Sequence, residues 1–417
     1  MIGPIEAIQS FVITRWRSRA GQSRGGFERW QNRAVRTWLK KRLPKVGFYK
    51  IADGQLSDLP VNDKATLMAH FDQFNTHGLT ADAAWEVLKS GGQHGDLTVG
   101  ASTGTSGNRG LFVVSEREKH RWLGAIVAKT MADLMWKPQR VAIILPQDTG
   151  LYGNANRLSF IKLRTFSVLE PPQDWRADLE QFDPTVIVAP PKMLRYFAQH
   201  NYAIRPVRVF SAAETLDRVD EWIANAFFDH PIRQIYMATE GLLAVSCAHG
   251  TLHLAEDSVA FEYESLGDGL VSPLITSFRR DTQIMARYRM NDVLRLSDTP
   301  CPCGSPLQPV AEIVGRMDDV FVFDGAVQIT PDVMRNAVLD ADRMITDFRL
   351  IQMSNDRVVL RLPPSVTSQT AQKACHAVQA LLERFRTSAQ VVLEQIDLPL
   401  QTNQKLRRVE RRVSKDG

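Results

Sequence analysis

Strands and helices alternate through the middle of this 417-residue chain, and this alternation constrains the fold more than any other feature. A helical pattern over 116–136 is followed by an apolar strand at 141–145, and the same order then repeats. Further strands are predicted at 185–189, 207–210 and 234–236, with helices at 191–200 and 221–228. Strands separated by helices at this spacing form a mostly parallel sheet that helices cover on both faces.

The pattern changes twice in the second half of the chain. After residue 241, short β-like segments follow one another without long helices, which predicts an antiparallel β subdomain. After residue 315, strands and two helices indicate a small α+β unit of about 100 residues. We therefore expect an α/β protein with a large N-terminal domain (1–315), containing doubly wound sheets and the β subdomain, and a small mobile α+β C-terminal domain (316–417).

The net charge of +5 is concentrated at the two ends of the chain. Residues 1–50 are rich in arginine and lysine and contain two acids, Glu6 and Glu28, and the C-terminal tail is also basic. Such segments are either solvated helix faces or docking surfaces for an acidic partner, such as an acyl carrier protein, or for an anionic membrane surface. No recognised nucleic-acid-binding fold accompanies the charge, so we expect no nucleic-acid partner.

The sequence predicts neither a transmembrane segment nor a secretion signal. No run of 18 apolar residues is present, and Arg15 and Arg17 interrupt the apolar N-terminus. Four cysteines in a chain of this length do not make a disulfide scaffold. We expect a cytoplasmic protein that contacts membranes, if at all, peripherally through its basic N-terminus.

A loop of small residues, 100–107, lies between two β-like runs at 97–99 and 111–114. Its glycines let the backbone approach a ligand, and its hydroxyl and N–H groups can surround phosphate oxygens. It is not a Walker loop, because no Gly-Lys-Ser/Thr ends it and no helix follows. The alternative interpretation is a flexible surface turn.

Four further stretches follow this loop in a fixed order. They are Tyr236-Met-Ala-Thr-Glu-Gly241, Tyr288-Arg-Met-Asn-Asp292, Val314-Gly-Arg-Met-Asp-Asp319, and Lys405 near the C-terminus. Together with the loop they resemble the adenylate-forming superfamily of acyl-CoA ligases and adenylation domains. The most similar branch is that of the phenylacetate–CoA ligases and the deazaflavin-cofactor adenylating synthetases. The resemblance extends from about Pro60 to the C-terminus.

This resemblance implies that the small-residue loop holds the phosphates of ATP. The family usually has a lysine at the end of the loop, where this chain has Asn108 and Arg109, and Arg109 would supply the positive charge instead. The implied phosphate-binding residues are Ser102, Thr103, Gly104, Thr105, Ser106, Gly107 and Arg109.

The resemblance also assigns the residues around adenine and the metal ion. Tyr236 would pack on adenine, beside the loop that contains Ala213 and Glu214. Thr239 would contact the α-phosphate and Glu240 would hold Mg²⁺, because a carboxylate is tolerated beside a triphosphate only with a cation between them. The alternatives are helix caps, by the Thr239–Glu240 pair and by Ser211.

Three further assignments concern the ribose and the moving parts of the enzyme. Asp292 would accept hydrogen bonds from both ribose hydroxyls, and Arg316 would add a ribose or phosphate contact. Asp318 matches the family's hinge. Lys405 would reach the carboxylate and the α-phosphate during adenylation, although a solvated basic tail is the alternative.

A second group of residues suggests a structural zinc site. Cys247, His253, Cys301 and Cys303 form a Cys₃His set, which is an accepted zinc coordination sphere. The single residue between Cys301 and Cys303 is shorter than the usual spacing, and His249 is a competing ligand. The alternative is a set of reduced, buried cysteines.

The function implied by the resemblance is ATP-dependent activation of a carboxylic acid as an acyl-adenylate. A thioester with coenzyme A or a carrier-protein phosphopantetheine would follow, and the acid would be aromatic or medium-chain. Two alternatives stay open. One is a nucleotidyl transferase that leaves AMP on its product, and the other is a nucleotide-binding scaffold without catalysis.

Overall fold

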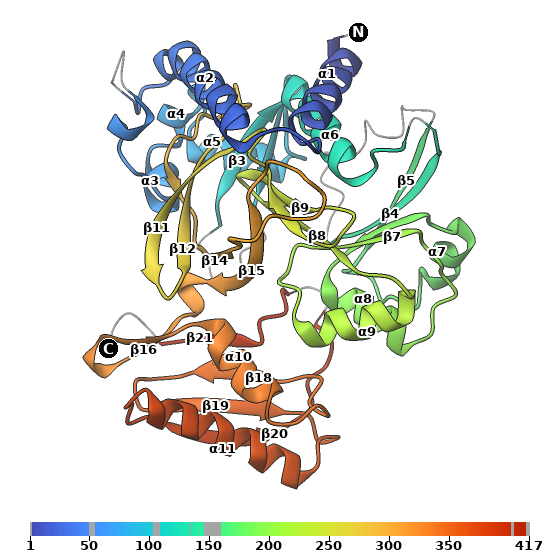
Figure 1. Ribbon diagram of the computed structural model, residues 1–417, viewed down its shortest axis with the longest axis vertical. Coiled ribbons are helices and arrows are strands. Elements are labelled where there is room, and N and C mark those ends of the chain that lie inside the picture. The colour runs from blue at the N-terminus through green and yellow to red at the C-terminus, as the bar shows by residue number, and fades with distance from the viewer. Residues whose placement is uncertain are drawn as a thin grey trace.

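The computed structural model describes residues 2–49, 55–102, 109–134, 136–145, 160–401 and 404–413. A 12-stranded sheet runs through the upper part of the molecule, and the chain after it forms a four-stranded sheet of its own (Figure 1). The N-terminal helices lie at one end of the molecule and the four-stranded sheet at the other.

The N-terminal segment is helical, as its spacing predicts. Its helices are α1 (Ile2–Arg17), α2 (Arg24–Arg42), α3 (Lys64–Ala69), α4 (Phe71–Phe74) and α5 (Ala81–Lys89), with 3₁₀ turns η1 (Leu43–Lys45) and η2 (Leu56–Asp58). The sequence offers Asn62 or Asp63 as the cap of α3, and the Asp63 side chain takes this role by accepting a hydrogen bond from the Thr66 N–H.

The small-residue loop joins two strands of a three-stranded sheet. The strands are β1 (Gln93–His94), β2 (Leu97–Ala101) and β3 (Leu111–Ser115). β2 and β3 pair antiparallel from Leu97 opposite Ser115 to Ala101 opposite Leu111. The predicted strand–loop–strand context is therefore present, although residues 103–108 lie outside the described part of the chain.

The parallel half of the large sheet has the order β5-β4-β6-β7-β8. Its strands are β4 (Gln139–Leu145), β5 (Ile161–Ser167), β6 (Val186–Ala189), β7 (Arg208–Ala212) and β8 (Arg233–Ala238), and its helices are α6 (Glu116–Thr130), α7 (Arg176–Phe182), α8 (Pro191–Gln199) and α9 (Arg218–Phe228). Apolar residues of these strands form cores with α6 on one side and α8 on the other.

The antiparallel strands continue this sheet and do not form a sheet of their own. The sheet changes from parallel to antiparallel pairing at the tight hairpin between β8 and β9. The remaining strands are β9 (Gly241–Ser246), β10 (Leu252–Leu254), β11 (Ala260–Gly267), β12 (Leu270–Thr276), β13 (Tyr288–Arg289), β14 (Asp292–Leu296) and β15 (Pro309–Arg316). The expected β subdomain is thus an extension of the parallel sheet.

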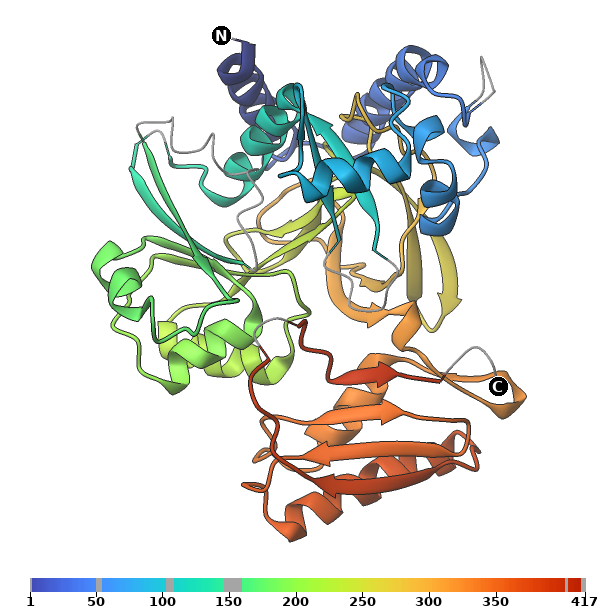
Figure 2. The same cartoon turned by 180° about the vertical axis from the view of Figure 1, so that it is seen from behind.

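The C-terminal segment, here called the small domain, has its own sheet and core. Its elements are η4 (Met317–Asp319), β16 (Phe321–Phe323), η5 (Asp324–Ala326), β17 (Val327–Ile329), α10 (Pro331–Leu339), β18 (Arg349–Gln352), β19 (Arg357–Leu362), α11 (Ser368–Arg384), β20 (Gln390–Gln395) and β21 (Val409–Arg411). The sheet order is β20-β19-β18-β21, and Figure 2 shows α11 lying against it. Arg316, where the small domain is predicted to begin, is the last residue of β15 and directly precedes η4.

The α/β fold class predicted from the sequence is confirmed, with one helix shorter than expected. The pattern over 116–136 predicts a helix that continues to residue 136, but α6 ends at Thr130 because Met131 leaves the helical conformation (φ −135°, ψ 57°). Asp133 then forms an ion pair with Arg208 of β7. No described helix is long and apolar enough to cross a membrane.

Candidate active site

One cavity of about 1170 Å³ brings together the predicted nucleotide-site residues from both ends of the chain. Those that line it are Ser102, Arg109, Ala213, Glu214, Tyr236, Thr239, Glu240, Asp292, Arg316, Asp318 and Lys405. Thr103, Gly104, Thr105, Ser106 and Gly107 belong to the expected phosphate loop and lie outside the described residues.

Tyr236 and Asp292 meet although 56 residues separate them. Tyr236 lies in β8, two residues before the end of the strand, and its hydroxyl donates a 2.5 Å hydrogen bond to Asp292 Oδ2. Burial raises the pKa of Tyr236 well above its usual value, and the Asp292 carboxylate raises it further. Asp292 starts β14 directly opposite Arg316 at the end of β15, so sheet register places the acid and the base side by side.

Thr239 and Glu240 form the two-residue turn between β8 and β9. Thr239 Oγ1 donates to Glu240 Oε2 at 2.9 Å. Burial, together with the Glu240 carboxylate, raises the pKa of the neighbouring Tyr288 hydroxyl. No helix starts at this pair, so the helix-cap alternative is wrong here, and it is also wrong for Ser211, which lies inside β7.

The base of the small-residue loop is closed by Ser102 and Gly110. The Ser102 N–H donates to Gly110 O at 2.8 Å, and the Gly110 N–H donates to Ser102 Oγ at 2.8 Å. Arg109 turns back, with its Nε donating to Ser102 O and its guanidinium over the Trp85 ring. The side chain of Lys64 lies against Gly110, so close that a Cβ added there would be 3.0 Å from Lys64 Cε.

Lys405 reaches the cavity on a segment that Lys192 of α8 holds in place. Lys192 Nζ donates to the carbonyls of Gln401 and Gln404, at 3.1 and 2.5 Å, and forms a 2.9 Å ion pair with Glu214. Burial raises the pKa of Glu214, and Lys192 offsets part of this effect. Burial in the cavity lowers the pKa of Lys405, and Glu214 opposes that shift.

The residues after Lys405 are not a solvated basic tail, so that alternative is wrong. Arg407 forms ion pairs with Asp319 and Glu410. Arg408 is 4% exposed and bonds to Asp217 and Asp220, both buried in the large domain.

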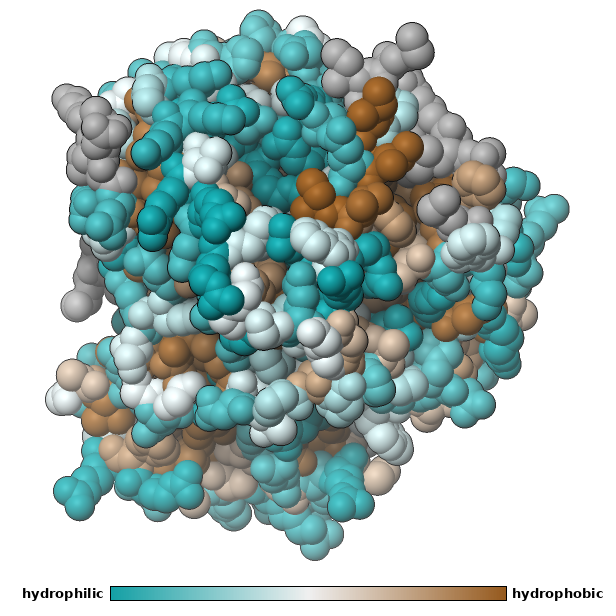
Figure 3. Space-filling model, turned by 45° about the horizontal axis from the view of Figure 1, so that its top comes forward, coloured by the Kyte–Doolittle hydropathy of each residue, from teal (hydrophilic) through white to brown (hydrophobic). Residues whose placement is uncertain are grey.

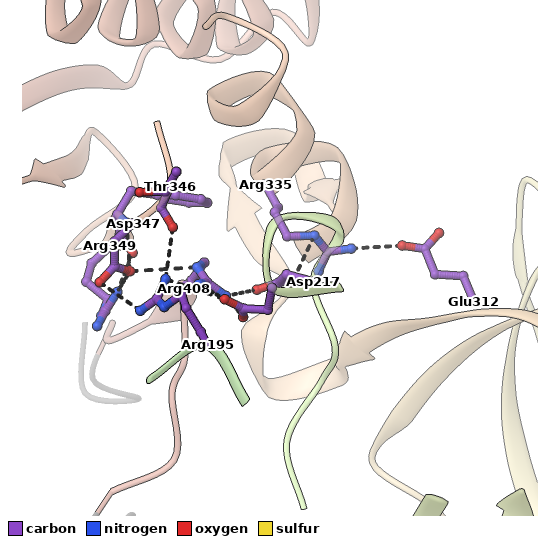
Figure 4. A network of polar contacts seen from close by, with 10 residues as sticks. Arg195, Asp217, Glu312, Arg335, Thr346, Asp347, Arg349 and Arg408 are labelled. Atoms are coloured by element: carbon purple, nitrogen blue, oxygen red, sulfur yellow. Dashed lines mark hydrogen bonds and ion pairs between the residues drawn. The ribbon is translucent and has the colours of Figure 1, made fainter. Parts of the chain in front are cut away.

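The Arg408 contacts belong to a network across the interface of the two domains (Figure 4). Arg335 of α10 contacts Asp217 at 3.2 Å and Glu312 of β15 at 2.8 Å. From the large domain, Arg195 donates to Thr346 O at 2.9 Å and pairs with Asp347 at 3.4 Å. We call this set of contacts the interdomain network.

Asp318 lies exposed in η4, where the chain leaves β15. Its Oδ2 accepts a 2.5 Å hydrogen bond from Asn291 Nδ2 and lies 3.5 Å from Arg316 Nη2. These contacts tie the expected hinge to the start of β14 and to the end of β15 in the present arrangement.

The cavity also has an apolar compartment between α6 and the parallel sheet. The compartment is lined by one face of α6 and by alternate residues of β4 and β5, which point to the same side of the sheet. These residues are Leu123, Ile126, Val127, Thr130, Val141, Ile143, Leu145, Ile161 and Leu163.

Comparison with known proteins identifies the fold. No family model and no curated protein matches the sequence. Solved structures do match: 2-hydroxyisobutyryl-CoA ligase in its postadenylation state, in complex with 2-HIB-AMP, has a TM-score of 0.73 at 16% identity over 96% of this chain and 92% of that one. ATP-bound MatB from Rhodopseudomonas palustris has a TM-score of 0.54 at 14% identity over 73% and 65%. Anthranilate CoA ligase AuaEII in complex with anthranoyl-AMP has 0.53 at 12% identity over 74% and 65%.

The chain has the fold of the adenylate-forming ligases. The predicted superfamily resemblance is thereby confirmed at the level of fold, and the phenylacetate branch stays a prediction.

The TM-scores with 2-hydroxyisobutyryl-CoA ligase differ between the states of that enzyme: 0.73 and 0.66 for two postadenylation complexes, 0.62 for an open conformation and 0.56 for the thioesterification state.

Sequence reasoning missed three residues that line the cavity of this adenylate-forming fold. Lys64 lies four residues after Pro60, where the resemblance begins, and received no role from the sequence, while Tyr288 entered only as the start of its motif. Lys192 gave no signal at all, because its partners Glu214 and Gln404 are 22 and 212 residues away in the chain.

The four predicted zinc ligands lie together, away from the nucleotide residues. Their ligand atoms are all within 4.8 Å of one another, and His253 rather than His249 completes the set. Cys247 Sγ lies 3.7 Å from Cys301 Sγ, and Cys303 Sγ lies 3.4 Å from His253 Nε2. Tetrahedral zinc with Zn–S bonds of about 2.3 Å requires S–S edges of roughly 3.8 Å, so the donor set fits the ion.

Two contacts connect the zinc-ligand cluster to its surroundings. His253 Nδ1 lies 3.0 Å from Leu307 O, which leaves Nε2 for the metal. The Gly21 N–H, in the turn between α1 and α2, donates to Gly304 O beside Cys303. A metal ion here would therefore be structural and would also hold the turn between the N-terminal helices.

We expect protein purified without chelator to contain about one zinc per chain by elemental analysis. Cys303→Ser should lower both the zinc content and the melting temperature, because a tetrahedral site loses one of its ligands. Cys375→Ser, in α11 and outside the cluster, is the matched control and should change neither. Metal-free protein with Cys303→Ser as stable as the parent would contradict the zinc site.

Proposed function

We propose that the protein activates a carboxylic acid with ATP and then transfers the acyl group to a thiol. A carboxylate oxygen attacks the α-phosphorus of ATP, and pyrophosphate leaves with the electrons of the broken P–O bond. The thiol sulfur then attacks the acyl carbon, loses its proton and expels AMP. The observation that carries this proposal is the single cavity, which joins a set of charged nucleotide-site residues to an apolar compartment.

The nucleoside would be held by Tyr236, Asp292 and Arg316. The Tyr236 ring would stack on adenine, and the Asp292 carboxylate would accept hydrogen bonds from the ribose hydroxyls. The 2.5 Å hydrogen bond between Tyr236 and Asp292 fixes the direction of the acceptor. The Arg316 guanidinium faces Asp292 across the strand pair and would contact the ribose or the α-phosphate.

Glu240 and Thr239 would hold Mg²⁺ and the α-phosphate. The Glu240 carboxylate offers oxygen ligands that suit a hard cation, and Thr239 Oγ1, 2.9 Å from Glu240 Oε2 in the same turn, would donate to an oxygen of the α-phosphate. Mg²⁺ would neutralise the phosphate charge when bound. The chain itself supplies orientation, because the β8–β9 hairpin fixes both side chains.

Lys64 is our candidate for the positive charge that the phosphate loop lacks. Its side chain lies against Gly110 at the end of that loop, whereas Arg109 is directed toward Ser102 and Trp85. Lys64 also interacts electrostatically with Glu240 and Asp318. Arg109 would then shape the base of the loop rather than bind phosphate directly.

The acid would be apolar, either aromatic or medium-chain. The compartment between α6 and the sheet is lined by aliphatic side chains of β4 and β5 and by Leu123, Ile126 and Val127 of α6. Burying a hydrocarbon chain against such a wall is favourable in proportion to the area removed from water. Lys405 would meet the carboxylate end of the acid at the nucleotide side of the cavity.

The second half-reaction would use a different arrangement of the domains. The small domain would turn about Asp318, breaking the interdomain network and withdrawing Lys405 from the cavity. The thiol would belong to coenzyme A or to a carrier-protein pantetheine. The carrier protein and the cytoplasmic location stay predictions.

A panel of acids tests the proposal. Each acid is incubated with MgATP and hydroxylamine, and both the acyl hydroxamate and the released pyrophosphate are measured. We expect turnover with aromatic or medium-chain acids and little with short polar acids. ATP binding without pyrophosphate release would favour the silent scaffold, and an adenylylated product without AMP release would favour the nucleotidyl transferase.

A further inference from the structure

The helix α1 is packed with its polar face inward and its apolar face outward. Ser10 and Thr14 are 0% exposed, and Glu6 is also buried. Phe11 packs against the core beside α6, but the other large apolar side chains are exposed: Ile5 at 55%, Ile8 at 64%, Val12 at 57%, Ile13 at 39% and Trp16 at 45%. A helix on a protein surface normally shows the opposite distribution.

The inward polar face is fully engaged with the rest of the molecule. Ser10 Oγ donates to Arg121 O at 2.6 Å, and Thr14 Oγ1 donates to the buried Asp257 at 3.0 Å. Glu6 forms ion pairs with Arg117 and Arg121 of α6. Rolling α1 to hide its apolar residues would break all of these contacts.

The packing of α1 on α6 leaves no room for such a rotation. The backbone of Ala7 approaches Gly124 so closely that a Cβ on Gly124 would lie 2.1 Å from Ala7 O. The outward direction of Ile5, Ile8, Val12 and Trp16 is therefore a fixed property of the fold.

A basic surface on α2 accompanies the apolar surface of α1. Arg29, Arg33, Arg36 and Lys40 are exposed and spaced at one face of the helix. The two acids among residues 2–49 do not neutralise them, because Glu6 is buried and Glu28 pairs with Arg24. Figure 3 shows hydrophobic side chains gathered over α1 and hydrophilic ones over α2 on the same end of the molecule.

We propose that this end of the molecule binds the surface of an anionic lipid bilayer. Ile5, Ile8, Val12 and Trp16 would insert between the lipids, with α1 lying in the plane of the interface. The α2 arginines and lysine would meet the phosphates of the headgroups. A helix of 16 residues suits this orientation and is too short to span a bilayer.

Two observations favour a bilayer over a protein partner. Two copies joined through α1 would bring their basic α2 faces toward each other, which is electrostatically unfavourable. A carrier protein would need to deliver its thiol to the acyl-adenylate at the charged end of the cavity, beside β14 and β15, and α1 lies at the opposite end of the large domain (Figure 1). An anionic membrane complements both the apolar and the basic surface.

Cosedimentation with vesicles tests the proposal. The full chain should bind vesicles of phosphatidylcholine containing phosphatidylglycerol, bind weakly to phosphatidylcholine alone, and be released by salt. Ile8→Glu/Val12→Glu should weaken binding by on the order of a hundredfold, because two side chains lose their insertion. Arg33→Glu/Arg36→Glu should remove the preference for anionic vesicles.

Matched substitutions separate insertion from general loss of hydrophobicity. Trp16→Glu should weaken vesicle binding, whereas Trp222→Glu, at an exposed tryptophan of α9, should not. All of these variants change exposed side chains and should melt like the parent. The proposal is overturned by absence of binding to anionic vesicles, by equal binding of Ile8→Glu/Val12→Glu, or by a dimer in sedimentation velocity that this variant abolishes without any vesicle binding.

Discussion

Lys405→Ala is expected to slow adenylation by about a hundred- to a thousandfold. The Lys405 ammonium lies in the cavity near Asp292 and Glu214, where it would neutralise charge as the carboxylate attacks phosphorus. Thioester formation from supplied acyl-AMP should be nearly intact, because that step would use the rotated small domain. Pyrophosphate release measures the first half-reaction, and AMP release with the thiol measures the second.

Because the Lys405 ammonium can lose its proton, the rate of adenylation should depend on pH. Burial lowers the pKa of Lys405, so its ammonium is present below that pKa and is lost as the pH rises through it. The alkaline limb of the adenylation profile should lie below the ordinary lysine value of about 10.4 and disappear in Lys405→Ala. Lys373→Ala, at an exposed lysine of α11, is the control. Equal loss in both half-reactions would contradict the assignment.

Arg408→Met is expected to destabilise the domain arrangement of this structure by up to about 3–5 kcal/mol, because the buried Asp217 and Asp220 lose the arginine that bonds to both and keep only the longer contacts to Arg335 and Arg195. Adenylation should slow by on the order of a hundredfold, since fewer molecules occupy this arrangement. Small-angle scattering should show a changed shape for Arg408→Met and an unchanged one for Lys405→Ala.

The control for the interdomain network is an arginine four residues away. Arg412 pairs with Glu410 on the surface, so Arg412→Met should cost about 0–1 kcal/mol and leave both half-reactions unchanged. If Arg408→Met keeps the parent's shape and its adenylation rate, the interdomain network does not hold the two domains together.

The sequence predicted β4, β6, β7 and β8 of the parallel half of the sheet, because each is a short, largely apolar run, but it did not predict β5, in which Lys162 and Arg164 interrupt the apolar residues. It missed β15, whose run is framed by Pro309 and Gly315 and whose residues alternate only in part between buried and exposed. β14 and β15 then bring Asp292 to Arg316, a contact that sheet register decides. The sequence thus predicted the order of the motifs along the chain, but not the contacts between their side chains.

Long-range ion pairs explain most of what the sequence left undecided in the site. Arg408 looked like part of a basic tail because its partner Asp220 lies 188 residues earlier. Apolar spacing predicted α1 as a helix but not its orientation. Polar partners on α6 and the Asp257 carboxylate, 243 residues from Thr14, determine which side of α1 is buried.

Helix α6 packs on α1 with one face and lines the apolar compartment with another, and this has a thermodynamic consequence. Its outer face holds α1 through Gly124 and Arg121, while Leu123, Ile126 and Val127 line the apolar compartment. The binding free energies of two coupled sites are linked. If binding to a lipid surface raises the affinity for an acid by some factor, that acid must raise the affinity for the lipid surface by the same factor. Binding of an acid in the compartment would therefore change the fraction of the protein that cosediments with vesicles, because both sites contact α6.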